Sequence, residues 1–177
     1  MTIRRGEAWG EASTVPPDSS MTSDDASLAG LPAGSVAVLT GGDLWHALGR
    51  PIAGGAGAEC TIVPVDAIGW SVTLADGRIV EGIAASCVEI GRWFGSGHRY
   101  VCATNPGIVD SLNVAPRAHP NDGRLDVMEI DPAMSLRQRF TARRRSRTGT
   151  HVPHPSIGIR QTDTVTIDAS RAGERLR

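Results

Sequence analysis

The sequence contains no lysine, little net charge and no long apolar run, and each absence narrows what the protein can do. All 18 basic residues are arginines, so no lysine can act as a nucleophile, a Schiff base or a phosphate clamp. No run approaches the roughly 18 apolar residues of a membrane-spanning helix, which predicts a soluble protein. With a formal net charge of −1, bulk electrostatic binding to nucleic acid is not expected.

Cysteine is also scarce, because the chain has only Cys60, Cys87 and Cys102. Their odd number and wide spacing fit neither a disulfide framework nor a zinc site. We therefore expect the protein in a reducing cytoplasm. A length of 177 residues allows one domain, or one domain with an appended segment.

The chain divides into three stretches of different composition. Residues 1–30 are polar and lack hydrophobic periodicity, which predicts a disordered leader, with a docked edge element as the alternative. Residues 31–59 contain a short strand, a Gly-Gly-Asp turn, a short helix and a linker rich in glycine and alanine. In residues 60–177 short strands alternate with turn signals, which is typical of a β-sandwich. One of these turns, Asp76-Gly77, predicts a hairpin.

One helix is predicted inside the strand-rich stretch. Asp131 is expected to be its N-cap, with Pro132 at the first helical position. Leu136 and Phe140 share a face and are expected to pack in the core. Gly149 can end the helix.

The other face of this helix is strongly basic. No acidic residue occurs from 133 to 150, and the face carries Arg137, Arg139, Arg143, Arg144, Arg145 and Arg147. The ordinary interpretation is a solvated helix face. The alternative is a peripheral contact with an anionic membrane, where each arginine near the lipid surface is worth about 1 kcal/mol.

Two turn signals enclose the segment 105–126, NPGIVDSLNVAPRAHPNDGRLD. An Asn-Pro-Gly turn opens it, and an Asn-Asp-Gly turn at 121–123 closes it with residues that tolerate positive φ. The string Ala-Pro-Arg-Ala-His-Pro-Asn-Asp-Gly-Arg-Leu-Asp-Val, followed by an arginine-bearing helix and Gly-Thr-His, resembles the C-terminal domain of the diacylglycerol kinase-like lipid kinases, a bacterial lipid kinase and NAD kinase-like group. The resemblance covers residues 65–167 and is tightest over 101–151.

This resemblance implies a Mg²⁺ site at the Asn-Asp-Gly turn. In the family the aspartate of the turn helps to bind the ion, together with two backbone carbonyls. Carried over, the ligands are Asp122 and the carbonyls of His119 and Arg124. Mg²⁺ prefers oxygen ligands and retains several waters. The alternative is a metal-free turn in which Asp122 bonds its own backbone.

The Gly41-Gly42-Asp43 turn resembles the start of the family's Gly-Gly-Asp-Gly-Thr phosphate loop, which implies ATP binding. A strand, two glycines and a helix can direct backbone N–H groups at a phosphate. Leu44 and Trp45 replace the family's Gly-Thr, however, and its later Gly-Thr-Gly-Asn segment is absent from the sequence. The simpler interpretation is a turn with Asp43 as the helix N-cap.

The catalytic base of the family is the glutamate of an Asp-Gly-Glu string, which deprotonates the lipid hydroxyl. This sequence has no such string; the nearest is Ala-Gly-Glu ending at Glu174, the one candidate that can be carried over. His151 and His154 are separated by a proline, which disfavours a helical zinc pair. His151 instead matches the family's structural Gly-x-His.

The sequence thus predicts a mainly β fold: a β-sandwich with one inserted basic helix and a short strand–Gly-Gly-Asp–helix appendage. Two functions are consistent with it. One is ATP- and Mg²⁺-dependent phosphorylation of a lipid hydroxyl, as in diacylglycerol. The other is a non-catalytic lipid- or protein-binding module that complements a separate nucleotide-binding chain. A partner chain or a second copy is an expected partner, and nucleic acid is not.

Overall fold

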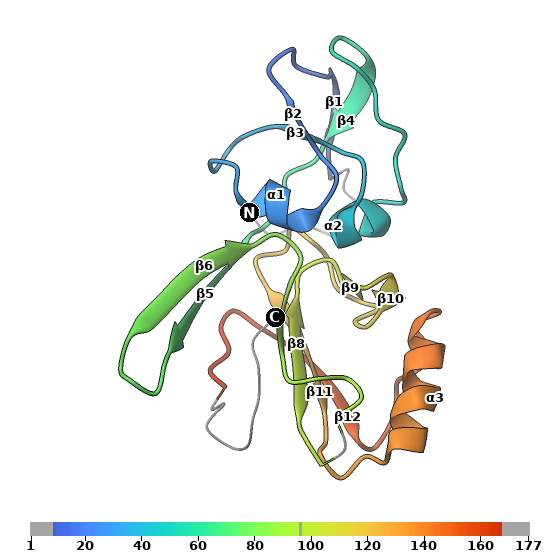
Figure 1. Cartoon of the computed structure of the whole chain (residues 1–177). Coiled ribbons are helices and arrows are strands. Elements are labelled where there is room, and N and C mark those ends of the chain that lie inside the picture. Colours follow the sequence, from blue (N-terminus) through green and yellow to red (C-terminus); the bar gives the residue numbers. More distant parts are fainter. Residues whose placement is uncertain (1–8, 96, 168–177) are drawn as a thin grey trace.

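The computed structural model describes residues 9–95 and 97–167, which form a small N-terminal part above a larger part built around a sheet (Figure 1). The N-terminal part contains β1 (Glu11–Thr14), β2 (Ser20–Thr22), α1 (Asp25–Ala29), β3 (Ala37–Leu39), α2 (Gly42–Ala47) and β4 (Glu59–Ile62). The larger part contains β5 (Ile68–Thr73), β6 (Ile79–Ala84), β7 (Cys87–Ile90), β8 (Tyr100–Thr104), β9 (Ile108–Val109), β10 (Leu112–Asn113), β11 (Leu125–Ile130), α3 (Leu136–Ser146) and β12 (Ile157–Thr162). The fold is mainly β with several small sheets and one inserted basic helix, as the sequence predicted.

The N-terminal part is held together by pairing between distant segments. β1 pairs antiparallel with β4, and β2 pairs in parallel with β3. Beyond β1, the amide of Val15 donates to the carbonyl of Ala58 at 2.9 Å. The prediction of a disordered leader is therefore wrong for residues 9–30. The polar composition gave no sign of this order, because the strands find their hydrogen-bond partners far along the chain.

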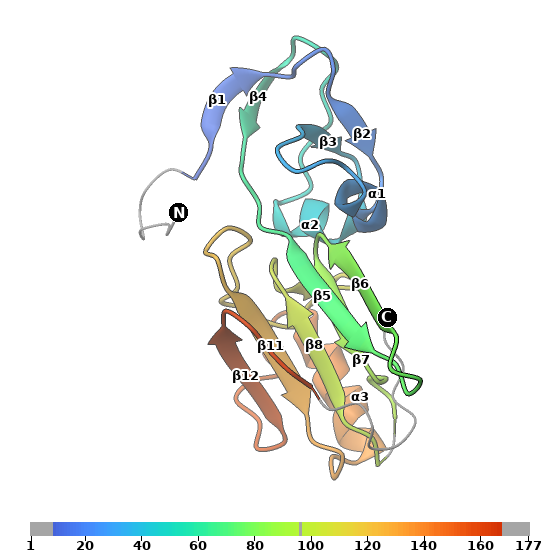
Figure 2. The ribbon, with the colours of Figure 1, turned by 90° about the vertical axis from the view of Figure 1, so that its left-hand side faces the viewer.

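A four-stranded sheet forms the centre of the larger part, in the order β12-β11-β8-β7 with every neighbouring pair antiparallel (Figure 2). The two central strands, β8 and β11, are almost wholly buried. In the register of the sheet Met128 lies opposite Cys102 on one side and Ile159 on the other. Burial on both faces agrees with the uncharged sequence of β8, whereas β11 also carries Asp126 and Glu129.

The sheet has an apolar cluster on each face, because successive strand residues point to opposite sides. Tyr100, Cys102 and Met128 pack on the face that α3 covers, which lies behind the sheet in Figure 2. Val101 and Val127 pack on the other face with the apolar side chains of the segment after β12. Burying each side chain of this size contributes about 1.5–3 kcal/mol, so apolar packing on both faces stabilises the folded sheet.

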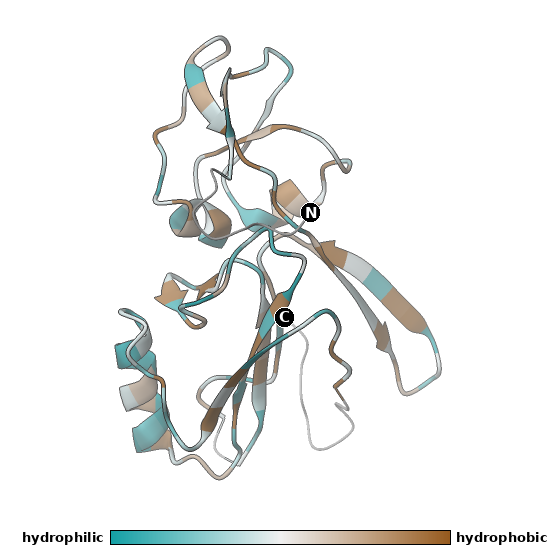
Figure 3. Cartoon of the chain, turned by 180° about the vertical axis from the view of Figure 1, so that it is seen from behind, coloured by the Kyte–Doolittle hydropathy of each residue, from teal (hydrophilic) through white to brown (hydrophobic). Residues whose placement is uncertain are grey.

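β5 and β6 form the hairpin that Asp76-Gly77 predicted. Gly77 has a φ of 82°, a left-handed conformation that glycine adopts without a steric penalty. The hairpin projects away from the sheet (Figure 1), and hydrophobic residues occur along both of its strands (Figure 3). Ile79 and Ile83 have exposed fractions of 65% and 60%.

The helix α3 begins later than the sequence predicted. Ser135 is its N-cap: its hydroxyl accepts from the amide of Gln138, whose side chain accepts from the amide of Ser135 at 3.0 Å. This reciprocal capping box satisfies two amides that the helix itself cannot. The prediction of Asp131 as N-cap is wrong, because its carboxylate instead accepts from the amide of Ala133 at 2.7 Å in the preceding turn.

The buried face of α3 differs from the predicted one and consists of Arg139, Ala142 and Ser146. Leu136 and Phe140, expected in the core, have exposed fractions of 49% and 66%, whereas Arg139, expected in solvent, is fully buried. The Arg139 guanidinium donates to four backbone carbonyls at 2.5–3.2 Å, those of Trp93, His98, Asp131 and Met134. A buried charge persists only when its donors are satisfied, and these carbonyls meet that condition.

Among the residues that the structure describes, no helix has the length and apolar character needed to cross a membrane.

Candidate functional site

The Asn-Asp-Gly turn at 121–123 is fastened to the segment that precedes β5. The Asp66 carboxylate accepts from the amide of Gly123 at 2.8 Å, and the Asp66 amide donates to the carbonyl of Pro120 at 2.8 Å. The buried side chain of Asn105 donates to the Asp66 carbonyl, also at 2.8 Å. Asp66 therefore connects both ends of the segment 105–126 and fixes the turn.

Asp122 is oriented by two donors. One carboxylate oxygen accepts from the amide of Arg124 at 3.0 Å, and the other accepts from the side-chain amide of Gln161 at 3.2 Å. The same Gln161 amide donates to Asp126 at 3.3 Å. Burial raises the pKa of Asp126, the bond from Gln161 opposes this effect, and the negative charge of Asp122 adds to it.

All three predicted metal ligands, His119, Asp122 and Arg124, belong to this turn. The His119 ring accepts from the amide of Asn121 at 3.2 Å and lies edge-on to the Trp9 ring, with 4.7 Å between centroids. Within residues 9–95 and 97–167, no three His, Cys, Asp or Glu side chains are grouped so as to hold a metal ion. An ion at Asp122 would therefore have one carboxylate, backbone carbonyls and water as ligands. Mg²⁺ accepts such a set, so the residues fit, and the metal site stays a prediction.

The Gly41-Gly42-Asp43 turn starts α2, but its amides already have an internal acceptor. The Asp25 carboxylate accepts from the amide of Asp43 at 2.7 Å and from the amide of Leu44 at 3.3 Å. The N-cap of α2 is Gly41, so the prediction of Asp43 as the cap is wrong. In this conformation a carboxylate of the chain itself bonds the amides that the phosphate-loop prediction assigned to a nucleotide.

The two glycines allow this approach. A Cβ atom on Gly42 would lie 2.5 Å from the Asp25 carboxylate, and one on Gly41 would lie 2.4 Å from the carbonyl oxygen of Ser23. Gly42 also has a φ of 92°, which side chains rarely adopt. Close packing against the residues around Asp25 is therefore a sufficient reason for the pair of glycines.

The side chain of Asp43 points toward the other predicted site segment. Its carboxylate accepts from the amides of Asp110 at 3.0 Å and Ser111 at 3.2 Å. Both of these residues have positive φ angles, 49° and 62°. Burial raises the pKa of Asp43, and the neighbouring carboxylates of Asp25 and Asp110 add to this, while the two amide bonds oppose it. The structure thus brings Asp43 to the segment 105–126, at Asp110 rather than at Asp122.

Among the described residues, His151 and His154 form no hydrogen bond with Asp43 or with the turn at 121–123. Glu174 lies outside the described residues. His151 is buried and donates from Nε2 to the carbonyl of Val114 at 3.1 Å, while its Nδ1 has no partner in the described part of the chain. Burial lowers the pKa of His151, with partial opposition from the Val114 bond. His154 accepts from the amide of Ser156 at 3.1 Å. The buried bond from His151 to Val114 agrees with the structural role predicted for His151.

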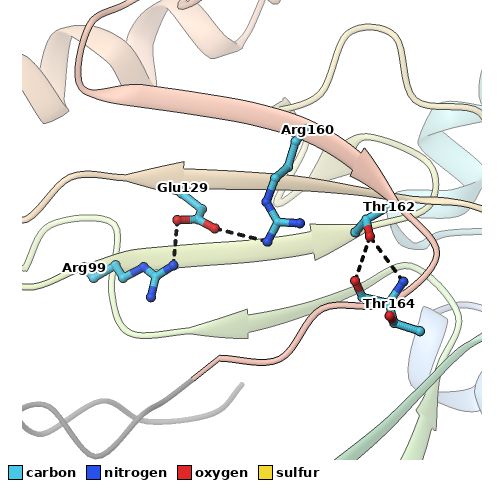
Figure 4. Close-up of polar contacts among 5 residues, drawn as sticks. All are labelled: Arg99, Glu129, Arg160, Thr162 and Thr164. Atoms are coloured by element: carbon cyan, nitrogen blue, oxygen red, sulfur yellow. Dashed lines mark hydrogen bonds and ion pairs between the residues drawn. The ribbon is translucent and has the colours of Figure 1, made fainter.

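An open groove of about 400 Å³ runs along the ends of β11 and β12. Glu129 lies between Arg99 at 2.6 Å and Arg160 at 3.4 Å in this groove (Figure 4). Because both arginines are paired with the same carboxylate, the charges largely compensate one another. None of the predicted site residues that the structure describes lines the groove.

A second hollow of about 310 Å³ lies between α3 and the loop after it. Its lining is largely basic, and includes Arg137, Arg145, His151 and His154. The spacing of these arginines and histidines in the sequence does not show that they meet. No sequence signal indicates that Phe94 packs against α3 either.

The central sheet, with the helix on one face and the tethered Asn-Asp-Gly turn, is consistent with a β-sandwich-like domain. Residues 92–176 match the family model of the YegS C-terminal NAD kinase beta sandwich-like domain. This part of the chain is therefore similar to the C-terminal domain of the YegS and diacylglycerol kinase-like lipid kinases. No curated protein and no solved structure matches the chain significantly. The matched part contains the turn and α3, and the Gly-Gly-Asp element lies before it.

Proposed function

We propose that the chain supplies the lipid-binding half of a diacylglycerol kinase-type lipid kinase and that a separate chain binds the nucleotide. The reaction is transfer of the ATP γ-phosphate to the hydroxyl of a lipid such as diacylglycerol. The observation that carries this proposal is the family match over residues 92–176, combined with a Gly-Gly-Asp turn whose amides are bonded to Asp25.

In this proposal the turn at 121–123 holds Mg²⁺ through Asp122 and the carbonyls of His119 and Arg124. The ion supplies charge neutralisation for the phosphates, on which phosphoryl transfer largely depends. The protein's own contribution is to position the turn. Asp66 fixes the turn on the fold, and Gln161 orients the Asp122 carboxylate.

Nucleotide binding by this chain alone is disfavoured by the Asp25 carboxylate. A phosphate at the start of α2 would have to displace Asp25 from the amides of Asp43 and Leu44, and the two anions would repel each other. The family's phosphate loop uses such amides for the nucleotide, so we assign this task to a partner chain.

The proposal is tested by calorimetric titration of the purified chain with MgATP and, separately, with dioctanoylglycerol in neutral micelles. We expect saturable binding of the lipid and none of MgATP. Transfer of radioactive phosphate from ATP to the lipid by this chain alone would show instead that it is a complete kinase. Failure to bind the lipid would rule out a lipid-binding half. An Asp25→Ala variant that gains MgATP binding would show that the loop is competent and that Asp25 blocks it.

A further inference from the structure

Three apolar side chains form an exposed cluster on α3 and the segment that packs against it. Leu136 and Phe140 lie one helical turn apart on the surface, and Phe94 has an exposed fraction of 48%. The rings of Phe94 and Phe140 are 6.4 Å apart between centroids. Exposed apolar residues that gather in this way, rather than standing singly, mark a surface that meets another apolar phase or partner.

Arginines border this cluster along the helix. Arg137, Arg144, Arg145 and Arg147 are exposed, and no acidic residue occurs between 133 and 150. The guanidinium of Arg143 lies 5.6 Å from the centre of the Phe94 ring. Arg139 is buried and contributes no surface charge.

The nearest acidic groups leave most of this charge uncompensated. Asp110 is 3.9 Å from Arg143, a long contact between partly exposed groups. Asp131 lies before the helix, where its carbonyl binds the buried Arg139. The remaining exposed arginines of α3 form no ion pair among the described residues.

We propose that α3 docks the protein on the surface of an anionic phospholipid bilayer. Leu136, Phe140 and Phe94 enter the boundary between headgroups and acyl chains, and the exposed arginines bind lipid phosphates. Because α3 has only 11 residues and two exposed apolar side chains, the contact is shallow, and electrostatic attraction to anionic lipids supplies much of the binding. The long apolar stem of arginine lets it remain beside buried apolar groups while its charge contacts the headgroups.

The basic hollow strengthens this assignment. Arg137 and Arg145 border it from α3, and His154 borders it from the following loop, so a headgroup phosphate has several donors there. A bilayer is the one occupant that meets the apolar cluster with hydrocarbon and the arginines with a dense array of phosphates. The docking surface does not depend on the proposed kinase role, because it uses neither the turn at 121–123 nor Asp43.

The test is flotation of the full chain with vesicles of phosphatidylcholine, with and without phosphatidylglycerol. One variant, Leu136→Ser/Phe140→Ser, removes two exposed apolar groups, and another, Arg137→Gln/Arg144→Gln, removes two exposed charges. The matched controls are Ile79→Ser/Ile83→Ser on the exposed hairpin and Arg78→Gln/Arg117→Gln elsewhere on the surface. Circular dichroism and a melting curve verify that each variant is folded.

We expect the chain to bind only the vesicles that contain phosphatidylglycerol, and less tightly as salt is raised. Each α3 double variant should lower the affinity by about tenfold or more, and the controls should bind like wild type. Equal binding to neutral vesicles, or none to either kind, would overturn the proposal. The proposal would also be overturned if Arg137→Gln/Arg144→Gln lost vesicle binding while Leu136→Ser/Phe140→Ser bound like wild type. Simple electrostatic adsorption would then account for the binding. Salt-sensitive binding to RNA or to an acidic polypeptide, without binding to vesicles, would assign the face to that partner instead.

A separate outcome distinguishes this surface from the proposed function. If the α3 variants lose vesicle binding while they still bind dioctanoylglycerol in micelles, the lipid-binding half stands and α3 is its membrane contact. If micellar lipid binding fails while vesicle docking persists, the kinase assignment fails and the docking surface stands.

Discussion

Arg139 is a charged residue of α3 that was predicted to face solvent but is fully buried. A guanidinium presents five N–H donors in a planar fork, and in this fold four carbonyls converge on that fork. All four carbonyls, those of Trp93, His98, Asp131 and Met134, lie outside the helix. Burial lowers the pKa of Arg139, and the Asp131 carboxylate opposes this, yet an arginine remains charged under all ordinary conditions. Arg139 therefore fixes the loops around α3 rather than serving as a surface charge.

His151 gives a prediction at the same scale. Its folded-state pKa is lowered, mainly by burial, so the unfolded chain binds the proton more readily, with a pKa of about 6.5. The stability that neutral His151 contributes is fully present above that value and is lost as the pH falls toward the folded-state pKa. We expect His151→Gln to lower the free energy of unfolding at pH 7.5 by about 1–2 kcal/mol and to flatten its decline below pH 6.5.

Urea unfolding of both proteins across this pH range measures the effect. The raised pKa values of Asp43 and Asp126 act in the opposite direction, since their protonation favours the folded state, but they act equally in both proteins. Parallel curves for wild type and variant would mean that His151 does not set the dependence.

At the scale of elements, the turn at 121–123 is preorganised by contacts from both sides. Asp66 fastens it from the segment before β5, and Gln161 reaches it from β12. A turn held in this way presents Asp122 without a further ordering cost, which favours binding of a ligand there.

This arrangement makes Asp122 testable without an activity assay. A ligand that binds only the folded state raises the melting temperature according to its concentration and affinity. We expect millimolar Mg²⁺ to raise the melting temperature of wild type and of an Asp163→Ala control, but not that of Asp122→Ala. An equal rise in all three proteins would place the ion elsewhere, and no rise in wild type would remove the metal from the proposal.

At the scale of the whole molecule, Asp43 links the N-terminal part to the larger part. Its carboxylate bonds the amides of Asp110 and Ser111, which lie between β9 and β10 and hold left-handed conformations. Such conformations cost about 1–3 kcal/mol for residues other than glycine, so they require support from their surroundings.

We expect Asp43→Ala to destabilise the protein by about 1–2 kcal/mol, which corresponds to roughly 2–8 °C in melting temperature for a chain of this size. Asp43→Asn should cost less, because it keeps an acceptor oxygen and removes a charge whose burial is unfavourable. Hydrogen exchange should show faster exchange at Asp110 and Ser111 in the alanine variant. The control is Asp18→Ala, which replaces an exposed aspartate. If Asp110 and Ser111 exchange no faster in Asp43→Ala than in this control, Asp43 does not couple the two parts.

Several features were determined by the sequence because their signals are local. The Asp76-Gly77 hairpin follows from turn chemistry between two strands, and the mainly β fold follows from short strands that alternate with turns. The lipid kinase resemblance rests on the string around residues 115–127, which can be recognised from the order of its residues without knowing which residues are in contact. These predictions are confirmed by the hairpin, the sheets and the family match.

Only the tertiary structure decided which groups are paired. Residues 9–30 are ordered because their strands find partners far along the chain, and the amides of Asp43 and Leu44 are bonded because Asp25 reaches them. On α3 the pattern of Leu136 and Phe140 indicated a core face, yet the face that is buried is the one with Arg139, Ala142 and Ser146. The burial of a polar group depends on whether its donors and acceptors are satisfied, and those partners come from parts of the chain that no local pattern connects.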